Sequence, residues 1–135
     1  WIDENGKKWV CTGDIGKLDE DGFIYFTGRK KRIIIISGYN VYPYSMEQKL
    51  MSLSYLREVC AVQGYDDNKK PVVKLCVALA DTDLSEEEIK EKLLSYCEEN
   101  FDHFSVPRKI VFMDALPRTK MDKLDFMAMS DKVPE

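Results

Sequence analysis

The strongest structural signal in this 135-residue sequence is a helix that begins after Ser85. Ser85 and Glu88 have the spacing of a capping box, in which each side chain accepts a hydrogen bond from the other residue's backbone N–H. An apolar stripe follows at helical spacing and comprises Ile89, Leu93, Tyr96 and Cys97. Because a helix with one apolar face must bury that face, we expect this segment to cover a sheet or a second helix.

Two segments before that helix predict strands, residues 58–65 and 72–80, and a polar loop at residues 66–71 separates them. Four consecutive isoleucines, Ile33–Ile36, predict a strand that is covered on both faces, because all four are β-branched and charged residues and glycine bound the run. Residues 37–40 are then expected to form a loop. Together these patterns predict a small sheet.

The first part of the chain predicts a β-hairpin. Short strand patterns run from Lys8 to Gly28, and a turn is expected at residues 19–22, where Gly22 supplies a positive φ. Residues 23–26 return as the second strand.

A first helix is predicted from Pro43, which suits an initial helical turn, to about residues 53–54. Its apolar face comprises Met46, Leu50 and Leu53. A last short strand is expected over residues 109–113, and a polar tail follows from Ala115. The order of these elements predicts an α+β fold, in which an N-terminal β-hairpin precedes a small mixed sheet packed with two or three helices.

Composition is that of an ordinary single globular domain, with 44% hydrophobic and 33% charged residues. The net charge of −4 disfavours a dedicated nucleic-acid binder. No apolar run approaches the roughly 20 residues of a membrane helix, so no transmembrane segment is expected. The four cysteines are scattered and His103 is the single histidine, so we expect free thiols, a cytoplasmic location and no metal site.

Three polar clusters interrupt this scaffold, and each has an ordinary structural interpretation beside a functional one. Asp14 follows a strand, where a carboxylate is able to accept both hydroxyls of a ribose or to bond its own backbone in a turn. Residues 28–32 form a basic run that is either a ligand contact or a solvated loop. Residues 118–123 form a second basic loop, in which a lysine is able to reach a phosphate or to remain in solvent.

These clusters belong to longer motifs that stand in one order along the chain: TGDIG at residues 12–16, YFTGRKKRIIIISGYNVYP at residues 25–43 and LPRTKMDK at residues 116–123. The series resembles the adenylate-forming superfamily, which contains acyl-CoA synthetases, the adenylation domains of peptide synthetases and luciferases. Such enzymes activate a carboxylate with ATP to an acyl-adenylate and then transfer the acyl group to a thiol. The likeness spans nearly the whole chain and implies the small C-terminal domain of such an enzyme.

The resemblance implies a role for five residues. Asp14 and Arg29 match the aspartate and arginine that contact the nucleotide ribose. Lys31 falls at the hinge about which the small domain rotates between the two half-reactions. Gly38 matches a loop glycine that faces the pantetheine arm of CoA, and Lys123 matches the catalytic lysine that reaches the α-phosphate and the attacking carboxylate.

The resemblance also implies a domain organisation. Residues 1–28 would be the end of a large N-terminal domain together with the hairpin that leads to the hinge, and residues 29–135 would be the C-terminal domain. The large catalytic domain, absent from this chain, would be its partner and would supply the acyl pocket and most contacts to Mg-ATP. ATP, CoA and a small carboxylic acid are therefore the expected ligands, and the isolated domain is expected to be inactive.

Residues 40–43, Asn-Val-Tyr-Pro, resemble the acyl-CoA synthetase version of this segment, especially that of fatty- and aryl-acid ligases. Two alternatives stay open. The chain is also compatible with an adenylation domain that loads a carrier protein, or with a non-catalytic module that binds phosphates or RNA through Arg29, Lys30, Lys31 and Arg32.

The sequence departs from the family pattern at two positions. Asp122 precedes the loop lysine where glycine is usual; aspartate tolerates a positive φ, but its charge could compete for the Lys123 ammonium. Ser45 stands where many relatives have glutamate, while Glu47 keeps the second acidic position of that helix.

Overall fold

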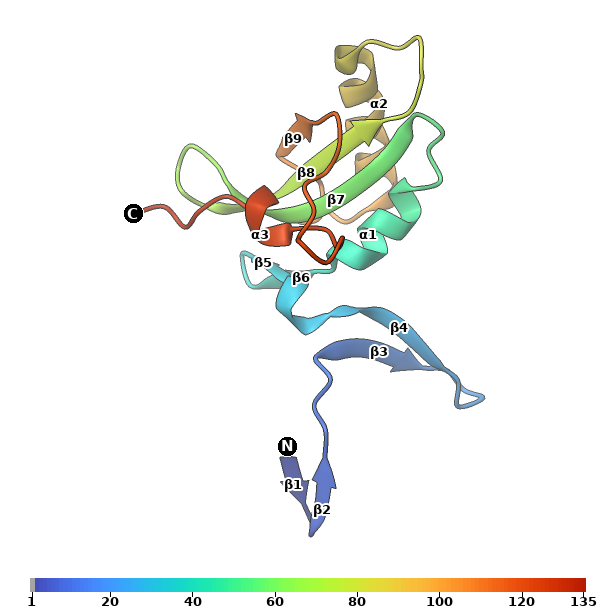
Figure 1. The fold of residues 1–135 in the computed structure, drawn as a ribbon, viewed down its shortest axis with the longest axis vertical. Coiled ribbons are helices and arrows are strands. Elements are labelled where there is room, and N and C mark those ends of the chain that lie inside the picture. Colours follow the sequence, from blue (N-terminus) through green and yellow to red (C-terminus); the bar gives the residue numbers. More distant parts are fainter. Residues whose placement is uncertain (1) are drawn as a thin grey trace.

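The computed structural model describes residues 2–135 and has an α+β fold, as the sequence predicts (Figure 1). Its strands are β1 (Ile2–Glu4), β2 (Lys7–Trp9), β3 (Asp14–Leu18), β4 (Ile24–Arg29), β5 (Ile34–Ile36), β6 (Tyr39–Val41), β7 (Leu56–Tyr65), β8 (Pro71–Leu79) and β9 (Lys109–Phe112). Its helices are the short 3₁₀ turn η1 (Lys30–Arg32), α1 (Pro43–Leu50), α2 (Glu86–Asn100) and α3 (Phe126–Met129). Within residues 2–135, no helix has the length and apolar character that crossing a membrane requires.

A mixed three-stranded sheet in the order β7-β8-β9 forms the centre of the main body (Figure 1). β7 and β8 pair antiparallel across the predicted polar loop, and β9 pairs parallel to β8 after the chain has passed through α2. The two long strands are almost continuously apolar because both faces of the sheet are covered. The three strands predicted for this region are therefore confirmed to within two residues at each end.

Two separate apolar clusters cover the opposite faces of this sheet. On one face, Val59 and Leu75 belong to a cluster that includes Leu50 of α1 and Leu93 of α2. On the other face, the strand residues Cys60 and Cys76 pack with Leu116 and Met129 from the C-terminal segment. Successive strand residues point to opposite faces, so this division follows directly from the alternation along β7 and β8.

The capping box of α2 is present as predicted. Ser85 Oγ accepts from the Glu88 backbone N–H at 3.2 Å, and Glu88 Oε2 accepts from the Ser85 N–H at 2.8 Å. The buried stripe of this helix is also confirmed by the full burial of Ile89, Leu93 and Cys97. This local signal was sufficient because cap and stripe both lie within one helix.

The isoleucine run differs from its prediction. Only Ile34 is buried, whereas Ile35 has 59% of its surface exposed, so the expectation of a strand covered on both faces was wrong. Residues 37–40 are not only a loop either, because the chain turns at Ser37 and Gly38 and returns as β6. Both turn residues have positive φ, 50° and 84°, which is the geometry of a tight hairpin.

The predictions for the end of α1 and for the C-terminal tail also need correction. α1 ends at Leu50 rather than near residues 53–54, since the chain turns there and Leu53 N–H donates to the Leu50 carbonyl at 3.0 Å. The tail is more than a polar loop, because Leu116 is buried and α3 adds a third helix that buries Met129. An isolated apolar residue in a polar segment gives no periodic signal, so this second cluster was not predicted.

The N-terminal part extends away from the main body as two hairpins (Figure 1). The predicted hairpin is β3–β4, in which Asp19 Oδ1 accepts from the backbone N–H groups of Asp21 and Phe23 to close the turn. A second hairpin, β1–β2, was not predicted, although the Asn5-Gly6 turn with φ of 54° and 76° is a typical signal for one.

Three of the four cysteines, Cys60, Cys76 and Cys97, are buried free thiols, whereas Cys11 is an exposed one. Burial raises the pKa of the three buried thiols, to about 11 at Cys97. These three groups therefore serve as small apolar side chains of the core.

Candidate functional site

The two residues expected to contact a ribose are direct cross-strand neighbours. Asp14 opens β3 and pairs in register with Arg29 at the end of β4, and Arg29 Nη1 lies 2.9 Å from Asp14 Oδ1. Their side chains are 39% and 59% exposed, so both groups remain accessible to a ligand. Asp14 is not simply a turn residue that bonds its own backbone, since its carboxylate is directed to Arg29.

The basic run at residues 29–32 is divided by η1 into outward and inward residues. Lys31, the expected hinge residue, is exposed, and the Lys30 N–H donates to the Gly13 carbonyl at 2.8 Å. Arg32 instead points inward and binds Glu47 of α1 through two hydrogen bonds of 3.0 and 2.5 Å. The interpretation of this run as one solvated loop therefore fails at Arg32, whose side chain is only 14% exposed.

Glu47 is the acidic partner that allows this arginine to be buried. Besides the two bonds from Arg32, its Oε2 accepts from the Ala61 backbone N–H at 2.9 Å. The pair thereby joins η1 to both α1 and β7. A bidentate arginine–carboxylate pair is geometrically specific, and a buried carboxylate without its arginine would be costly.

Gly38 lies at the tip of the β5–β6 turn with a φ of 84° and no atom within 4 Å of the position that a Cβ would occupy. The open space means that glycine is not required by packing within this domain. It is favoured by the backbone conformation, and it leaves the main chain accessible to a ligand.

A cavity of about 380 Å³ lies beside this turn and was not predicted from the sequence. Lys70, His103 and Arg108 line it together with Ser37, the neighbour of Gly38. Next to it, Tyr39 stacks on Phe104 with ring centroids 4.0 Å apart. The lining residues come from segments that are distant in sequence, so no local motif could have identified this group. Asp66 also lines the cavity, so its two cationic side chains, Lys70 and Arg108, outnumber one carboxylate.

Lys123 is exposed at the end of a loop whose backbone is firmly fixed. The Thr119 N–H donates to the Lys123 carbonyl at 2.7 Å, and Arg118 pairs with Leu124 in an isolated antiparallel bridge. The Arg118 guanidinium also binds Glu58 at the base of the loop, with Nη2 2.6 Å from Oε1. The ammonium of Lys123 is therefore presented to solvent on a defined scaffold.

Glu58 has a pKa that lies below its usual range. Partial burial by itself raises this pKa, but hydrogen bonds from the Leu116 N–H and from Arg118, together with the Arg118 charge, lower it further than burial raises it. Glu58 is thus ionised at neutral pH and anchors the loop through Arg118.

Asp122 adopts the positive φ expected of a residue that replaces glycine, at 59°. Its carboxylate lies 4.0 Å from Arg118 Nε and is 91% exposed. Among residues 2–135, no ion pair joins Asp122 to Lys123. The turn that carries the lysine is therefore formed despite the substitution, and competition for the ammonium has no support in this geometry.

The structure brings some of these residues together and leaves others apart. Asp14 and Arg29 meet, but no hydrogen bond or ion pair within the described residues links them to Gly38 or Lys123. The candidate residues thus lie on three separate surface features, namely the end of the β3–β4 hairpin, the β5–β6 turn and the C-terminal loop.

Comparison with known proteins identifies the class to which this chain belongs. Residues 45–123, more than half of the chain, match the model of the AMP-binding enzyme C-terminal domain. The chain therefore belongs to this family, the C-terminal domain of adenylate-forming ligases, whose fold it shares.

Three relatives illustrate the similarity. The chain is 35% identical over 116 residues to a long-chain-fatty-acid–CoA ligase of Salmonella typhimurium, covering 86% of this chain and 20% of that protein. It is 38% identical over 121 residues to a 2-succinylbenzoate–CoA ligase of Bacillus cereus, covering 90% and 24% respectively. The structure superposes on o-succinylbenzoate CoA synthetase of Bacillus subtilis, solved with its acyl-adenylate intermediate, with a TM-score of 0.79, 31% identity and coverage of 96% of this chain and 25% of that one. This chain thus spans about a fifth to a quarter of the length of these relatives.

Proposed function

We propose that this chain is the C-terminal cap of an ATP-dependent acyl-CoA ligase and supplies Lys123 to acyl-adenylate formation. The observation that carries the proposal is the presentation of Lys123, whose side chain is exposed while its loop is fixed by backbone bonds and by Arg118. Adenylation brings a carboxylate to a triphosphate and accumulates negative charge in the transition state. A preorganised cation at that point stabilises the transition state more than the separated reactants.

Asp14 and Arg29 form the nucleotide-binding pair in this proposal. A carboxylate that is held by an arginine and remains partly exposed is suited to accept hydrogen bonds from the two ribose hydroxyls of ATP. Magnesium and the triphosphate would be bound mainly by a large N-terminal domain outside residues 1–135.

The proposed boundary assigns residues 1–28 to that large domain and places the hinge at Lys31. Exposed apolar side chains on the N-terminal hairpins support this division: Trp9, Val10, Leu18, Phe23, Ile24, Tyr25 and Phe26. So many large exposed apolar side chains on two short hairpins are typical of an interface, although Phe26 also contacts Tyr44 of α1, with ring centroids 4.9 Å apart. We therefore expect the hairpins to pack on the large domain, with the main body free to rotate about η1.

Thioester formation would use the β5–β6 turn, where Gly38 leaves space for a pantetheine arm. CoA is favoured over a carrier protein as acceptor because Lys70 and Arg108 outnumber the one carboxylate, Asp66, in the cavity beside this turn, and this excess of positive charge would suit the phosphates of CoA. The other alternative, a module that binds phosphates or RNA through residues 29–32, loses support because Arg32 is buried against Glu47.

The test is acid-dependent ATP–pyrophosphate exchange by the full-length protein over a panel of short, fatty and aryl acids. Lys123→Ala is expected to lower the exchange rate by about 10²–10³-fold. Lys120→Ala removes an exposed lysine from the same loop and is expected to retain the wild-type rate. Equal rates for wild type and Lys123→Ala would overturn the assignment of the catalytic residue. Residues 1–135 alone are expected to give no exchange.

A further inference from the structure

Arg32 immediately follows the proposed hinge residue and is held on several sides by elements that are distant in sequence. Its guanidinium edge binds Glu47 of α1 through both nitrogens and also reaches the Ala61 carbonyl of β7 at 3.4 Å. One face of the guanidinium lies over the ring of Phe126, with Cζ 4.1 Å from the ring centroid. An edge-bound and face-covered guanidinium has little freedom to move independently of these partners.

Phe126 belongs to the segment that carries Lys123. It opens α3, three residues after the lysine, and Asp125 caps this short helix by accepting from the Ala128 N–H at 3.1 Å. The Asp125 N–H also donates to the Pro117 carbonyl at 2.9 Å, which closes the base of the loop. The lysine loop and Phe126 therefore form one connected unit.

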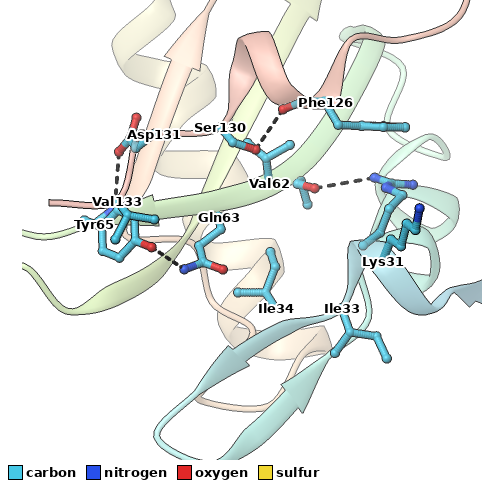
Figure 2. Close-up of a pocket in the computed structure, with 12 residues that line it drawn as sticks. Lys31, Ile33, Ile34, Val62, Gln63, Tyr65, Phe126, Ser130, Asp131 and Val133 are labelled. Atoms are coloured by element: carbon cyan, nitrogen blue, oxygen red, sulfur yellow. Dashed lines mark hydrogen bonds between the residues drawn. The ribbon is translucent and has the colours of Figure 1, made fainter.

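Phe126 and Lys31 line the same cavity of about 350 Å³ from α3 and from the hinge segment, as Figure 2 shows. The opposite part of the cavity wall contains Asp131, which binds Lys74 and Lys109 at 2.8 Å each and so ties the chain after α3 to β8 and β9. α3 is thus held by Asp131 on one side and by Arg32 on the other.

We propose that Arg32 and Phe126 form a positioning contact that sets the location of the Lys123 loop relative to the hinge. This inference rests on the proposed function, because it assigns a consequence to where Lys123 stands. Arg32 lies after the hinge, so the contact travels with the small domain when it rotates. The ammonium then arrives at the phosphate in the same place each time, which matters because a displacement of ~1 Å at a reacting centre costs about 100-fold in rate.

The contact requires a planar cation at residue 32 and an aromatic ring at residue 126. Substitutions that keep the charge or the apolar character but remove these groups therefore test positioning separately from packing. A lysine at residue 32 would still neutralise Glu47, yet it lacks the planar group that both grips a carboxylate and covers a ring. A leucine at residue 126 would remain apolar, yet it offers no π face to the cation. Tyrosine at residue 126 would retain the face and is the conservative control.

The experiment uses the full-length protein and the acid that gives the fastest wild-type exchange among acetate, octanoate, palmitate, benzoate and 2-succinylbenzoate. Two half-reactions are measured: ATP–pyrophosphate exchange, and thioester formation from CoA and the corresponding preformed acyl-adenylate. Phe126→Leu and Arg32→Lys are each expected to lower kcat for exchange by about tenfold or more, with the KM for ATP changed by less than about twofold. In both variants, thioester formation from the acyl-adenylate is expected to stay at the wild-type rate. Phe126→Tyr, which keeps the aromatic face, is expected to show wild-type exchange.

Wild-type exchange in folded Phe126→Leu and Arg32→Lys proteins would overturn the positioning role. An equal fall in the rates of both half-reactions would also overturn it, and so would slow exchange in Phe126→Tyr. Either result indicates a general structural effect. Lys123→Ala is measured in the same assays. If this variant keeps the wild-type exchange rate, the catalytic role of Lys123 in the proposed function is overturned, whatever the Arg32 and Phe126 variants show. Absence of exchange with every acid overturns the proposed function and this inference together.

Discussion

Asp14 and Arg29 face each other across the β3–β4 ladder and form an ion pair of 2.9 Å immediately before η1, the proposed hinge. Both side chains are more than a third exposed, so the pair adds little to folding, in the range of about 0–1 kcal/mol. Stability therefore does not account for the pair, whereas the proposed ribose contact would give it a role. In that proposal the carboxylate is already oriented to accept the two hydroxyls of a diol.

Asp14→Ala in the full-length protein is therefore expected to raise the KM for ATP by about 30-fold, because two hydrogen bonds to ribose of about 1 kcal/mol each are lost. The free energy of unfolding should change by less than about 1 kcal/mol. Steady-state kinetics and urea denaturation check these two outcomes. Asp21→Ala, an exposed position on the same hairpin, serves as the matched control. An unchanged KM in Asp14→Ala would exclude the ribose contact.

Gly38 offers a comparison with a glycine of similar geometry. Gly38 and Gly22 have φ of 84° and 86°, and at both positions the space that a Cβ would occupy has no other atom within 4 Å. Alanine at either position should cost about 1–2 kcal/mol of stability through backbone strain alone. Only Gly38→Ala is expected to slow thioester formation from acyl-adenylate and CoA, because only that turn is proposed to face the thiol. Equal effects of the two substitutions on the half-reaction would contradict the assignment of the turn.

Asp122 should respond in opposite directions to two small substitutions. Glycine adopts a φ of 59° without the strain that a Cβ causes, so Asp122→Gly is expected to leave stability unchanged or raise it by up to about 1 kcal/mol. Alanine keeps the strain and loses the tolerance of aspartate for this region, so Asp122→Ala is expected to lower stability by about 1 kcal/mol. Because Asp122 makes no ion pair with Lys123 among the described residues, the exchange rate of Asp122→Gly should remain within about threefold of wild type. Thermal unfolding and exchange assays measure these effects, and a large gain in exchange would show that the carboxylate does restrain the lysine.

Asp131 makes stability depend on pH at the acidic end. Partial burial raises its pKa, but hydrogen bonds from Lys109, Lys74 and the Tyr65 N–H lower it to about 2, below the ordinary value of 3.8. A carboxyl whose pKa is lowered by folding stabilises the protein above its unfolded pKa, and this contribution disappears as pH falls from about 4 toward about 2.

Asp131→Asn is expected to lower the free energy of unfolding at pH 7 by about 1 kcal/mol, a figure reduced for solvent screening because the side chain is partly exposed. The variant should also lose part of the decline in stability between about pH 4 and pH 2. Urea denaturation across this range measures both effects, with Asp67→Asn in the exposed β7–β8 loop as the control. A parallel pH profile for wild type and Asp131→Asn would refute the contribution of this group.

Much of the fold was accessible from the sequence because its signals are local. The capping box at Ser85 and Glu88, the strands flanking the polar loop and the turn before Phe23 each depend on residues within a few positions of one another. The isoleucine run failed because a continuous apolar segment does not reveal which side chains face a core, and here Ile34 is buried while Ile35 is exposed.

The sequence by itself determined which residues stand at the family's motif positions and are therefore proposed to carry its chemistry, namely Asp14, Arg29, Lys31, Gly38 and Lys123. It also determined that Asp122 would tolerate a positive φ, because this depends on a single residue's backbone preference. Only the tertiary structure decided that Arg32 turns inward to Glu47 and Phe126 while Lys31 stays in solvent. These neighbours have similar side chains and no local signal separates them. What distinguishes them is a carboxylate and an aromatic ring that packing brings from residues 47 and 126, and such long-range partners exist only once the chain has folded.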